Sequence, residues 1–385
     1  MRVHLDHNST TQMRPEVRKR WLEVVDEQLG NPSSLHASGR RARATVDDAR
    51  ACVAAALGVH EEEIFFTSGA TEANNLALFG VLESAGAEHG LVTTAVEHSS
   101  VLGPAQELAR CGRRVVLVPV DADGLPDPAA VACAAAESRA ALVSVTAANN
   151  ETGALPDLAA IAEALARLPS PHPRFHADAV QALGRLPLRL REWGLDLASF
   201  SAHKQGGPPG VGVLWRARGV ALAPRFHGGG QELELRPGTE NAPGIAAAAR
   251  AIELAVREQP TLSQRLGRLT RELWEGLSAS LPGVRLLGPP IESSERLPNT
   301  LCVRVPGTDG KVLVTRLDLA GLEVSAGSAC ASGALEPSHV LLAMGLTRDE
   351  ARSGLRLSLG WSTTAEDCKR ALDVFHAEFS SSRAT

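Results

Sequence analysis

One lysine stands where it could form a covalent bond with a carbonyl compound. Lys204 follows the short apolar run Leu197–Ser201, and a loop rich in Gly and Pro comes after it. The run is typical of a buried strand, and ligand sites in α/β sheets lie at the carboxyl ends of strands. A lysine there can form a Schiff base if burial or nearby positive charge keeps its amine partly deprotonated. The alternative is a solvated loop lysine, which is what most lysines are.

A second chemical pattern precedes this lysine along the chain. Gly69, Ala70 and Thr71 follow the apolar run Ile64–Thr67 and open a predicted helix. The free N–H groups at a helix N-terminus bind phosphate well. An ordinary helix with Thr71 as its N-cap is the alternative.

Polar side chains also follow three further predicted strands. His98 could stack on a flat ring or move a proton, although a structural histidine is the commoner case. Asn150, Asp178 and Gln181 could each be a turn or cap residue. Gathered on one sheet edge with Lys204, however, they supply the parts that bind pyridoxal phosphate, with the carboxylate facing the pyridinium nitrogen.

The elements that must position these groups alternate along the chain. Helical stretches separate most of seven short β-branched or apolar runs, which are Ile64–Thr67, Leu91–Ala95, Val115–Val118, Ala141–Thr146, Arg174–Ala177, Leu197–Ser201 and Val211–Leu214. Such alternation predicts an α/β fold with a seven-stranded, mainly parallel sheet covered on both faces.

The C-terminal third has a different character. An Ala-rich helix at about Ile245–Arg257 leads to Pro260, which we expect to end it, and a separate helix is predicted at Leu262–Leu281. Short strands and helices follow. We therefore predict a large domain at residues 14–258 and a smaller α+β domain made of residues 1–13 and 259–385.

Composition limits the classes of protein that remain. The chain has 385 residues, 44% of them hydrophobic, and a net charge of −5, so we expect no direct nucleic-acid binding and no membrane. It has no apolar run of about 20 residues and no signal sequence, which predicts a cytoplasmic protein. Its six cysteines are scattered, so neither a structural metal nor a disulfide framework is expected.

Across nearly its whole length, from residue 5 to about 375, the sequence resembles the cysteine desulfurases of the nitrogen-fixation and iron–sulfur-cluster type, which are class-V aminotransferase relatives. The resemblance rests on many short motifs in one order, among them Phe66–Asn75, Asn149–Gly153, Asp178–Gln181, Ser201–Lys204, Gly30–His36, Arg236–Asn241, Leu297–Thr300 and Arg356–Gly360. It implies the aminotransferase-type fold (fold type I), a homodimer, pyridoxal 5′-phosphate as cofactor, and release of sulfur from L-cysteine.

Roles carry over residue by residue. The resemblance implies that Lys204 is the Schiff-base lysine, that His98 stacks on the pyridine ring and that Asp178 faces the ring nitrogen. Arg356 resembles the anchor for the substrate carboxylate, with Asn31 a weaker candidate beside it. The remaining cofactor contacts are Gln181 and Asn150 near the phenolic oxygen, Ala70, Thr71, Ser201 and His203 at the phosphate, and Thr239 reaching the phosphate of the second subunit.

A free cysteine between small residues completes the pattern. Cys330 lies in a segment with two Gly, three Ser and three Ala, which suits an exposed loop at about residues 325–336. A small buried residue is the alternative, and it fits Cys302 better. The segment resembles the longer catalytic loop of the branch that hands sulfur to acceptor proteins. Cys330 would then carry the persulfide, with L-alanine as the product.

Rival functions remain open at this stage. A selenocysteine lyase or a cysteine or cystine β-lyase would use the same cofactor, and a non-catalytic scaffold for sulfur-transfer proteins would use none. The acceptor is also open: an iron–sulfur scaffold, a tRNA-thiolation carrier, a DNA-sulfur-modification complex or a biosynthetic carrier. Departures from the family pattern occur at Pro209, Leu233 and Glu234, and they leave the catalytic groups in place.

Overall fold

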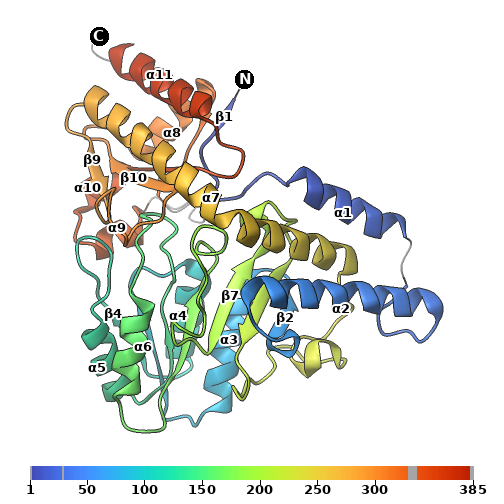
Figure 1. Ribbon diagram of the computed structural model, residues 1–385. Coiled ribbons are helices and arrows are strands. Elements are labelled where there is room, and N and C mark those ends of the chain that lie inside the picture. The colour runs from blue at the N-terminus through green and yellow to red at the C-terminus, as the bar shows by residue number, and fades with distance from the viewer. Residues whose placement is uncertain (1, 28–29, 328–335, 382–385) are drawn as a thin grey trace.

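A seven-stranded sheet forms the centre of the computed structural model, which describes residues 2–27, 30–327 and 336–381 (Figure 1). Its strand order is β2-β8-β7-β6-β5-β3-β4. All pairs except those made by β8 are parallel, which confirms the predicted sheet. The strands are β2 (Ile64–Thr67), β3 (Gly90–Thr94), β4 (Val115–Val118), β5 (Ala140–Ser144), β6 (Arg174–Asp178), β7 (Leu197–Ser201) and β8 (Gly212–Arg216).

Helices cover both faces of this sheet because its strands alternate apolar side chains between two cores. Phe65 packs with α3 and α4 in one core. Its neighbours Ile64 and Phe66 point to the other core, which α2, α5, α6 and α7 complete. These helices are α2 (Ala37–Leu57), α3 (Ala70–Ser84), α4 (Ser99–Arg110), α5 (Pro128–Ser138), α6 (Leu158–Ala166) and α7 (Ala242–Ser280), and α1 (Pro15–Asp26) packs on α7.

A second group of elements surrounds a three-stranded antiparallel sheet of order β12-β10-β9, made of β9 (Arg285–Leu287), β10 (Thr300–Arg304) and β12 (Gly354–Ser358). The N-terminal strand β1 (Val3–His4) pairs in parallel with β11 (Leu322–Glu323) beside it. Their core includes apolar residues of α8 (Gly310–Leu319) and α11 (Ala365–Ser381). The short helices are α9 (His339–Ala343), α10 (Arg348–Arg352), η1 (Glu61–Glu63), η2 (Ala202–Gln205) and η3 (Gln231–Glu234).

The prediction of two helices separated at Pro260 is wrong. A single helix, α7, runs from Ala242 to Ser280 with Pro260 inside it, and Figure 1 shows it passing from α2 to the end near α11. A proline within a helix costs about 3 kcal/mol. Here Pro260 is exposed, while Ile252 packs in the core of the large sheet and Leu269 in that of the small one. Packing of both halves therefore outweighs the local preference. The two-domain division stays a prediction.

The N-terminal segment joins the two groups of elements. Asp6 forms a bridge with Ser358 at the end of β12. The side chain of Asn8 donates to the hydroxyl of Thr300 at 2.9 Å and to the carbonyl of Asn150 at 3.1 Å. This segment thus lies between the small sheet and the loop that follows β5.

The described residues lack the features of a membrane-spanning helix and of a metal site. They contain no helix long and apolar enough to cross a membrane. They also contain no group of three or more His, Cys, Asp or Glu side chains that could hold a metal ion.

Candidate active site

A cavity of about 580 Å³ lies where the carboxyl ends of β2, β3, β5, β6 and β7 meet. Its lining includes ten residues predicted from the sequence, which are Ala70, Thr71, His98, Asn150, Asp178, Gln181, Ser201, His203, Lys204 and Arg356. Asn31 and Thr239 are exposed and do not line it. Cys330 lies outside the described residues. Of the twelve predicted site residues that the structure describes, one chain therefore brings together all but Asn31 and Thr239.

Lys204 enters the cavity from η2, directly after β7. The helix ends at Gly206, whose φ of 78° is a left-handed conformation that favours glycine. The Nζ atom of Lys204 donates to the carbonyl of Asn8 at 2.6 Å and to the carbonyl of Ser9. Burial, and then the charge of Lys204, lower the pKa of His203 to about 4, so His203 is neutral at physiological pH.

The N-terminus of α3 forms one wall. Ala70 is its first residue and Gly69 its N-cap, so the N–H groups of this turn have no partners within the helix. A side chain on Gly212 of β8 would lie 2.3 Å from the backbone of Gly69. Glycine at 212 therefore lets this turn lie against the sheet, as a phosphate cradle requires.

Asp178 ends β6 and is buried. Its Oδ2 atom accepts a hydrogen bond from the Asn74 side chain at 2.8 Å, and its Oδ1 atom accepts one from the Val180 N–H at 3.1 Å. Both carboxyl oxygens therefore have hydrogen-bond donors inside the protein. An ionised carboxylate at this position could pair with a protonated ring nitrogen.

His98 caps the N-terminus of α4. Its Nδ1 atom accepts from the Ser100 N–H at 3.1 Å and lies 2.7 Å from the Ser100 hydroxyl. These contacts fix the direction of the imidazole ring as it lines the cavity.

Glu97, behind His98, was missed in the sequence analysis. Its Oε1 atom accepts from the Thr94 hydroxyl at 2.7 Å and from the Thr146 N–H at 2.9 Å. Its Oε2 atom is buried with no hydrogen-bond partner among the described residues. Burial raises the pKa of Glu97 to about 8. The carboxyl is thus mostly protonated at pH 7.

Arg356 reaches the cavity from β12 of the small sheet. It is 1% exposed. It forms an ion pair with Asp6 at 2.6 Å and donates to the Ser9 hydroxyl at 2.7 Å and to the Asn150 carbonyl at 3.0 Å. Its Nε atom has no hydrogen-bond partner among the described residues. A guanidinium held in this way suits a carboxylate ligand.

The chemistry of these groups fits pyridoxal phosphate. The cavity offers a lysine, a buried carboxylate and a helix N-terminus for the aldehyde, the ring nitrogen and the phosphate respectively. The Oε1 atom of Gln181 is buried there without a partner among the described residues. Such an orphaned polar atom indicates that a further polar group belongs in the cavity.

Further lining residues were not among the predicted site residues. Asn8 and Ser9 belong to the N-terminal polar stretch, and His339 belongs to α9. Glu151 also lines the cavity, and its Oε2 atom accepts from the Ser338 hydroxyl at 2.6 Å. Of these four lining residues, only Glu151 had a signal in the sequence, because it directly follows the predicted site residue Asn150.

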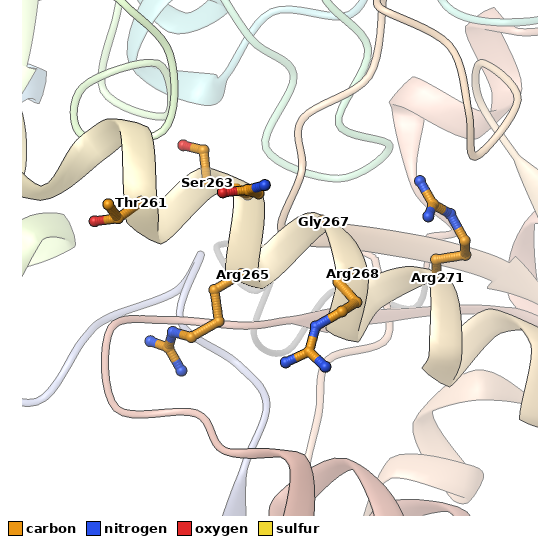
Figure 2. A pocket seen from close by; sticks show the side chains of 7 residues that line it. Thr261, Ser263, Arg265, Gly267, Arg268 and Arg271 are labelled. Atoms are coloured by element: carbon orange, nitrogen blue, oxygen red, sulfur yellow. The ribbon is translucent and has the colours of Figure 1, made fainter.

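A second cavity, of about 620 Å³, lies along α7. Figure 2 shows that Arg265 and Arg268 point to one side of the helix and Arg271 to the other. Arg265 donates to the carbonyls of Trp361 and Thr363, and Arg271 pairs with Glu292. No predicted site residue lines this cavity.

Comparison with known proteins identifies the class of enzyme. The chain matches the model of the aminotransferase class-V family over residues 3–371. It therefore belongs to that family, whose enzymes depend on pyridoxal phosphate.

Within this family the chain belongs to the cysteine desulfurases. It is 43% identical to the cysteine desulfurase of Cereibacter sphaeroides, with 97% of this chain and 94% of that protein covered. It is 41% identical to the cysteine desulfurase IscS of Clostridium botulinum, with 97% and 93% covered. A solved NifS-like protein superposes with a TM-score of 0.91 at 37% identity, with 99% and 100% covered.

Proposed function

We propose that the protein removes the sulfur of L-cysteine, releases L-alanine and holds the sulfur as a persulfide on Cys330. The observation that carries this proposal is the convergence of Lys204, Asp178 and Arg356 on one cavity. A lysine, a carboxylate and a carboxylate-binding arginine are the groups that a pyridoxal-phosphate enzyme of amino acids requires.

Each predicted residue would hold one part of the cofactor. Lys204 would bind it covalently, Asp178 would pair with its ring nitrogen and His98 would stack on the ring. Asn150 and Gln181 would contact the phenolic oxygen. The phosphate would be held by Ala70, Thr71, Ser201, His203 and, from the second subunit, Thr239. When bound, the cofactor supplies an electron sink for the substrate Cα carbon.

The chain's other groups act on the substrate. Arg356 binds its carboxylate, and Asn31 stays a weaker candidate for the same task. The amine of Lys204 takes the Cα proton. The thiolate of Cys330 attacks the substrate sulfur, so that an S–S bond forms as the C–S bond breaks. The carbon skeleton keeps the electron pair of the broken bond and takes up a proton to become alanine.

The surroundings of the enzyme are part of the proposal. We propose a homodimer, because Thr239 lies outside the cavity of its own chain. The sulfur passes from Cys330 to an acceptor protein whose identity stays open. We also propose a cytoplasmic location, which fractionation of the source cells would test.

Replacing Lys204 tests the central assignment. The Lys204→Ala protein is expected to lose the visible absorbance of the bound cofactor and more than 99% of alanine formation from cysteine, because it lacks the amine that binds the aldehyde. Exposed Lys311→Ala is the matched control and should behave like the wild type. Normal turnover by Lys204→Ala would contradict the assignment. Formation of pyruvate in place of alanine by the wild type would identify a β-lyase instead.

Replacing Cys330 tests the sulfur route. Cys330→Ser should still bind cofactor and cysteine but lose persulfide formation, since a hydroxyl does not accept sulfur as a thiolate does. Cys111→Ser is the control, because Cys111 is exposed and distant in sequence. Burial raises the pKa of Cys302 to about 12, so Cys302 should stay unmodified. Mass spectrometry that finds the persulfide on Cys111 or Cys302, and none on Cys330, would remove Cys330 from the route.

A further inference from the structure

A chain of hydrogen bonds links Asp178 to His98 inside the protein. It runs through Asn74, a fully buried residue of α3 that has no part in the function proposed above. The Asn74 amide nitrogen donates to Asp178 Oδ2 at 2.8 Å and to the Ser100 hydroxyl oxygen at 2.8 Å. That hydroxyl lies 2.7 Å from His98 Nδ1. Two residues of the proposed active site thus share one amide group.

The orientation of this amide is determined by its neighbours. Its oxygen, Oδ1, is buried without a hydrogen-bond partner among the described residues. The reversed amide would place that oxygen against the Asp178 carboxylate, and both groups would be acceptors. Asn74 therefore directs both of its N–H bonds into the network. The Asn74 amide nitrogen donates a hydrogen bond to Asp178 and cannot take up a proton from it.

The proton on His98 is located by a second donor. The backbone N–H of Ser100 can only donate, and it donates to Nδ1 at 3.1 Å. A hydrogen on Nδ1 would point at this N–H group, so Nδ1 is unprotonated and a neutral ring carries its proton on Nε2. The amide of Asn74 occupies one lone pair of the Ser100 oxygen, which favours turning the hydroxyl hydrogen toward Nδ1.

We propose that Asn74 is a positioning residue that sets the protonation pattern of the site. It donates to Asp178 and, through the Ser100 hydroxyl, supplies the second of two donors to the unprotonated Nδ1 of His98, which favours the neutral tautomer with its proton on Nε2. His98 then starts the reaction as a proton donor, and the base for the Cα proton is Lys204. These roles of His98 and Lys204 in the reaction rest on the proposed function, whereas the tautomer of His98 does not. Among the described residues, the other titratable groups that line the cavity or adjoin His98 are Glu97, Glu151, His203, Lys204, His339 and Arg356.

Nitrogen NMR of protein labelled with ¹⁵N-histidine tests this directly, in the holoenzyme and after removal of the cofactor. A His98→Gln protein identifies the His98 signals among the 12 histidines. In the wild type at pH 7.5, Nδ1 should be unprotonated and Nε2 protonated. In Asn74→Ala, the Ser100 hydroxyl is no longer directed toward Nδ1, so the unprotonated Nδ1 loses one of its two donors. The protonation constant of His98 should then rise roughly five- to tenfold, as expected for one hydrogen bond.

Two further variants make the result decisive. Ser100→Ala removes the hydroxyl that links Asn74 to His98 and leaves the Asn74–Asp178 hydrogen bond in place. It should also raise the protonation constant of His98. This variant keeps the test available if Asn74→Ala does not fold. Ser84→Ala, on the same helix and bonded to the Gly80 carbonyl, should leave the His98 signals unchanged. A wild-type His98 protonated at Nδ1, or unaltered His98 signals in both network variants, would overturn the proposal. The predicted tautomer in a protein without desulfurase activity would contradict the proposed function and leave this inference standing.

Discussion

Burial decides which titratable side chains near the cavity carry charge. His203, Glu97 and the fully buried His176 all favour their neutral forms because the charged forms would lose their water. Arg356 is buried as well but forms an ion pair with Asp6. The cavity thus combines a few paired charges with neutral groups that can donate or accept protons.

The raised pKa of Glu97 predicts a loss of stability at alkaline pH. Its pKa is raised from 4.5 to about 8 in the folded protein, so the folded state keeps this proton to a higher pH than the unfolded state. Its contribution to stability is complete below pH 4.5 and is lost as the pH rises through 8. Between pH 6 and pH 9 the wild type should lose about 3 kcal/mol of unfolding free energy from this group.

Glu97→Gln should remove that loss, because glutamine has the shape of the protonated acid. Urea unfolding of both proteins at pH 6 and pH 9 measures the difference. The exposed Glu88→Gln is the control and should follow the wild type. Equal losses in the wild type and in Glu97→Gln would show that Glu97 ionises without cost.

At the scale of the elements, η3 contains strained backbone. Glu232 and Leu233 have φ values of 48° and 54°, and Glu234 has 66°. Contacts of Glu232 stabilise this conformation: its carboxylate pairs with Arg50 at 2.6 Å and accepts from the Phe66 N–H at 2.8 Å. Because Leu233 and Glu234 carry a Cβ atom, their left-handed backbone has a conformational cost.

Leu233→Gly should increase stability. Leu233 is 63% exposed, so little packing is lost, while left-handed backbone in a residue with a Cβ atom costs about 1 kcal/mol. After the greater entropy loss of glycine, we expect a gain of about 0.5 kcal/mol in unfolding free energy. Leu35→Gly, at a leucine that is 90% exposed and has no positive φ, should give no gain. A loss of stability in Leu233→Gly would show that this side chain packs against a surface such as a second subunit.

At the scale of the whole molecule, one chain does not complete the predicted phosphate site. Thr239 lines a small adjoining cavity that shares Ser68 and Gly210 with the main one. If it serves the second subunit, mixing refolded Lys204→Ala and Thr239→Val chains creates dimers with one intact site. Activity should then recover to roughly a quarter of the wild type, because half of the dimers are mixed and half of their sites are complete.

Sedimentation of the wild type supplies the companion measurement and should give a dimer. Refolded Thr239→Val alone is the control for recovery. A fully active monomer would rule out the shared site, and no recovery in mixtures that do form dimers would place the action of Thr239 within its own chain.

Local sequence determined the seven strands and the order of the site motifs. Each strand is a short apolar run whose burial depends on its own residues, and parallel strands must bring their carboxyl ends to one edge. Lys204, Asp178, His98 and six other predicted residues could therefore be assigned to one sheet edge before its geometry was known, whereas the assignment of Arg356 came from the family resemblance alone.

Tertiary structure decided what depends on partners far apart in the chain. Arg356 and Asp6 pair across 350 positions, and the Asn74 amide joins Asp178 across 104. No local pattern reveals such contacts, because periodicity reports which face is buried and not which polar group lies opposite. The continuity of α7 through Pro260 has the same cause: the two cores on which its halves pack are assembled from distant segments, and their packing outweighs the preference of one residue.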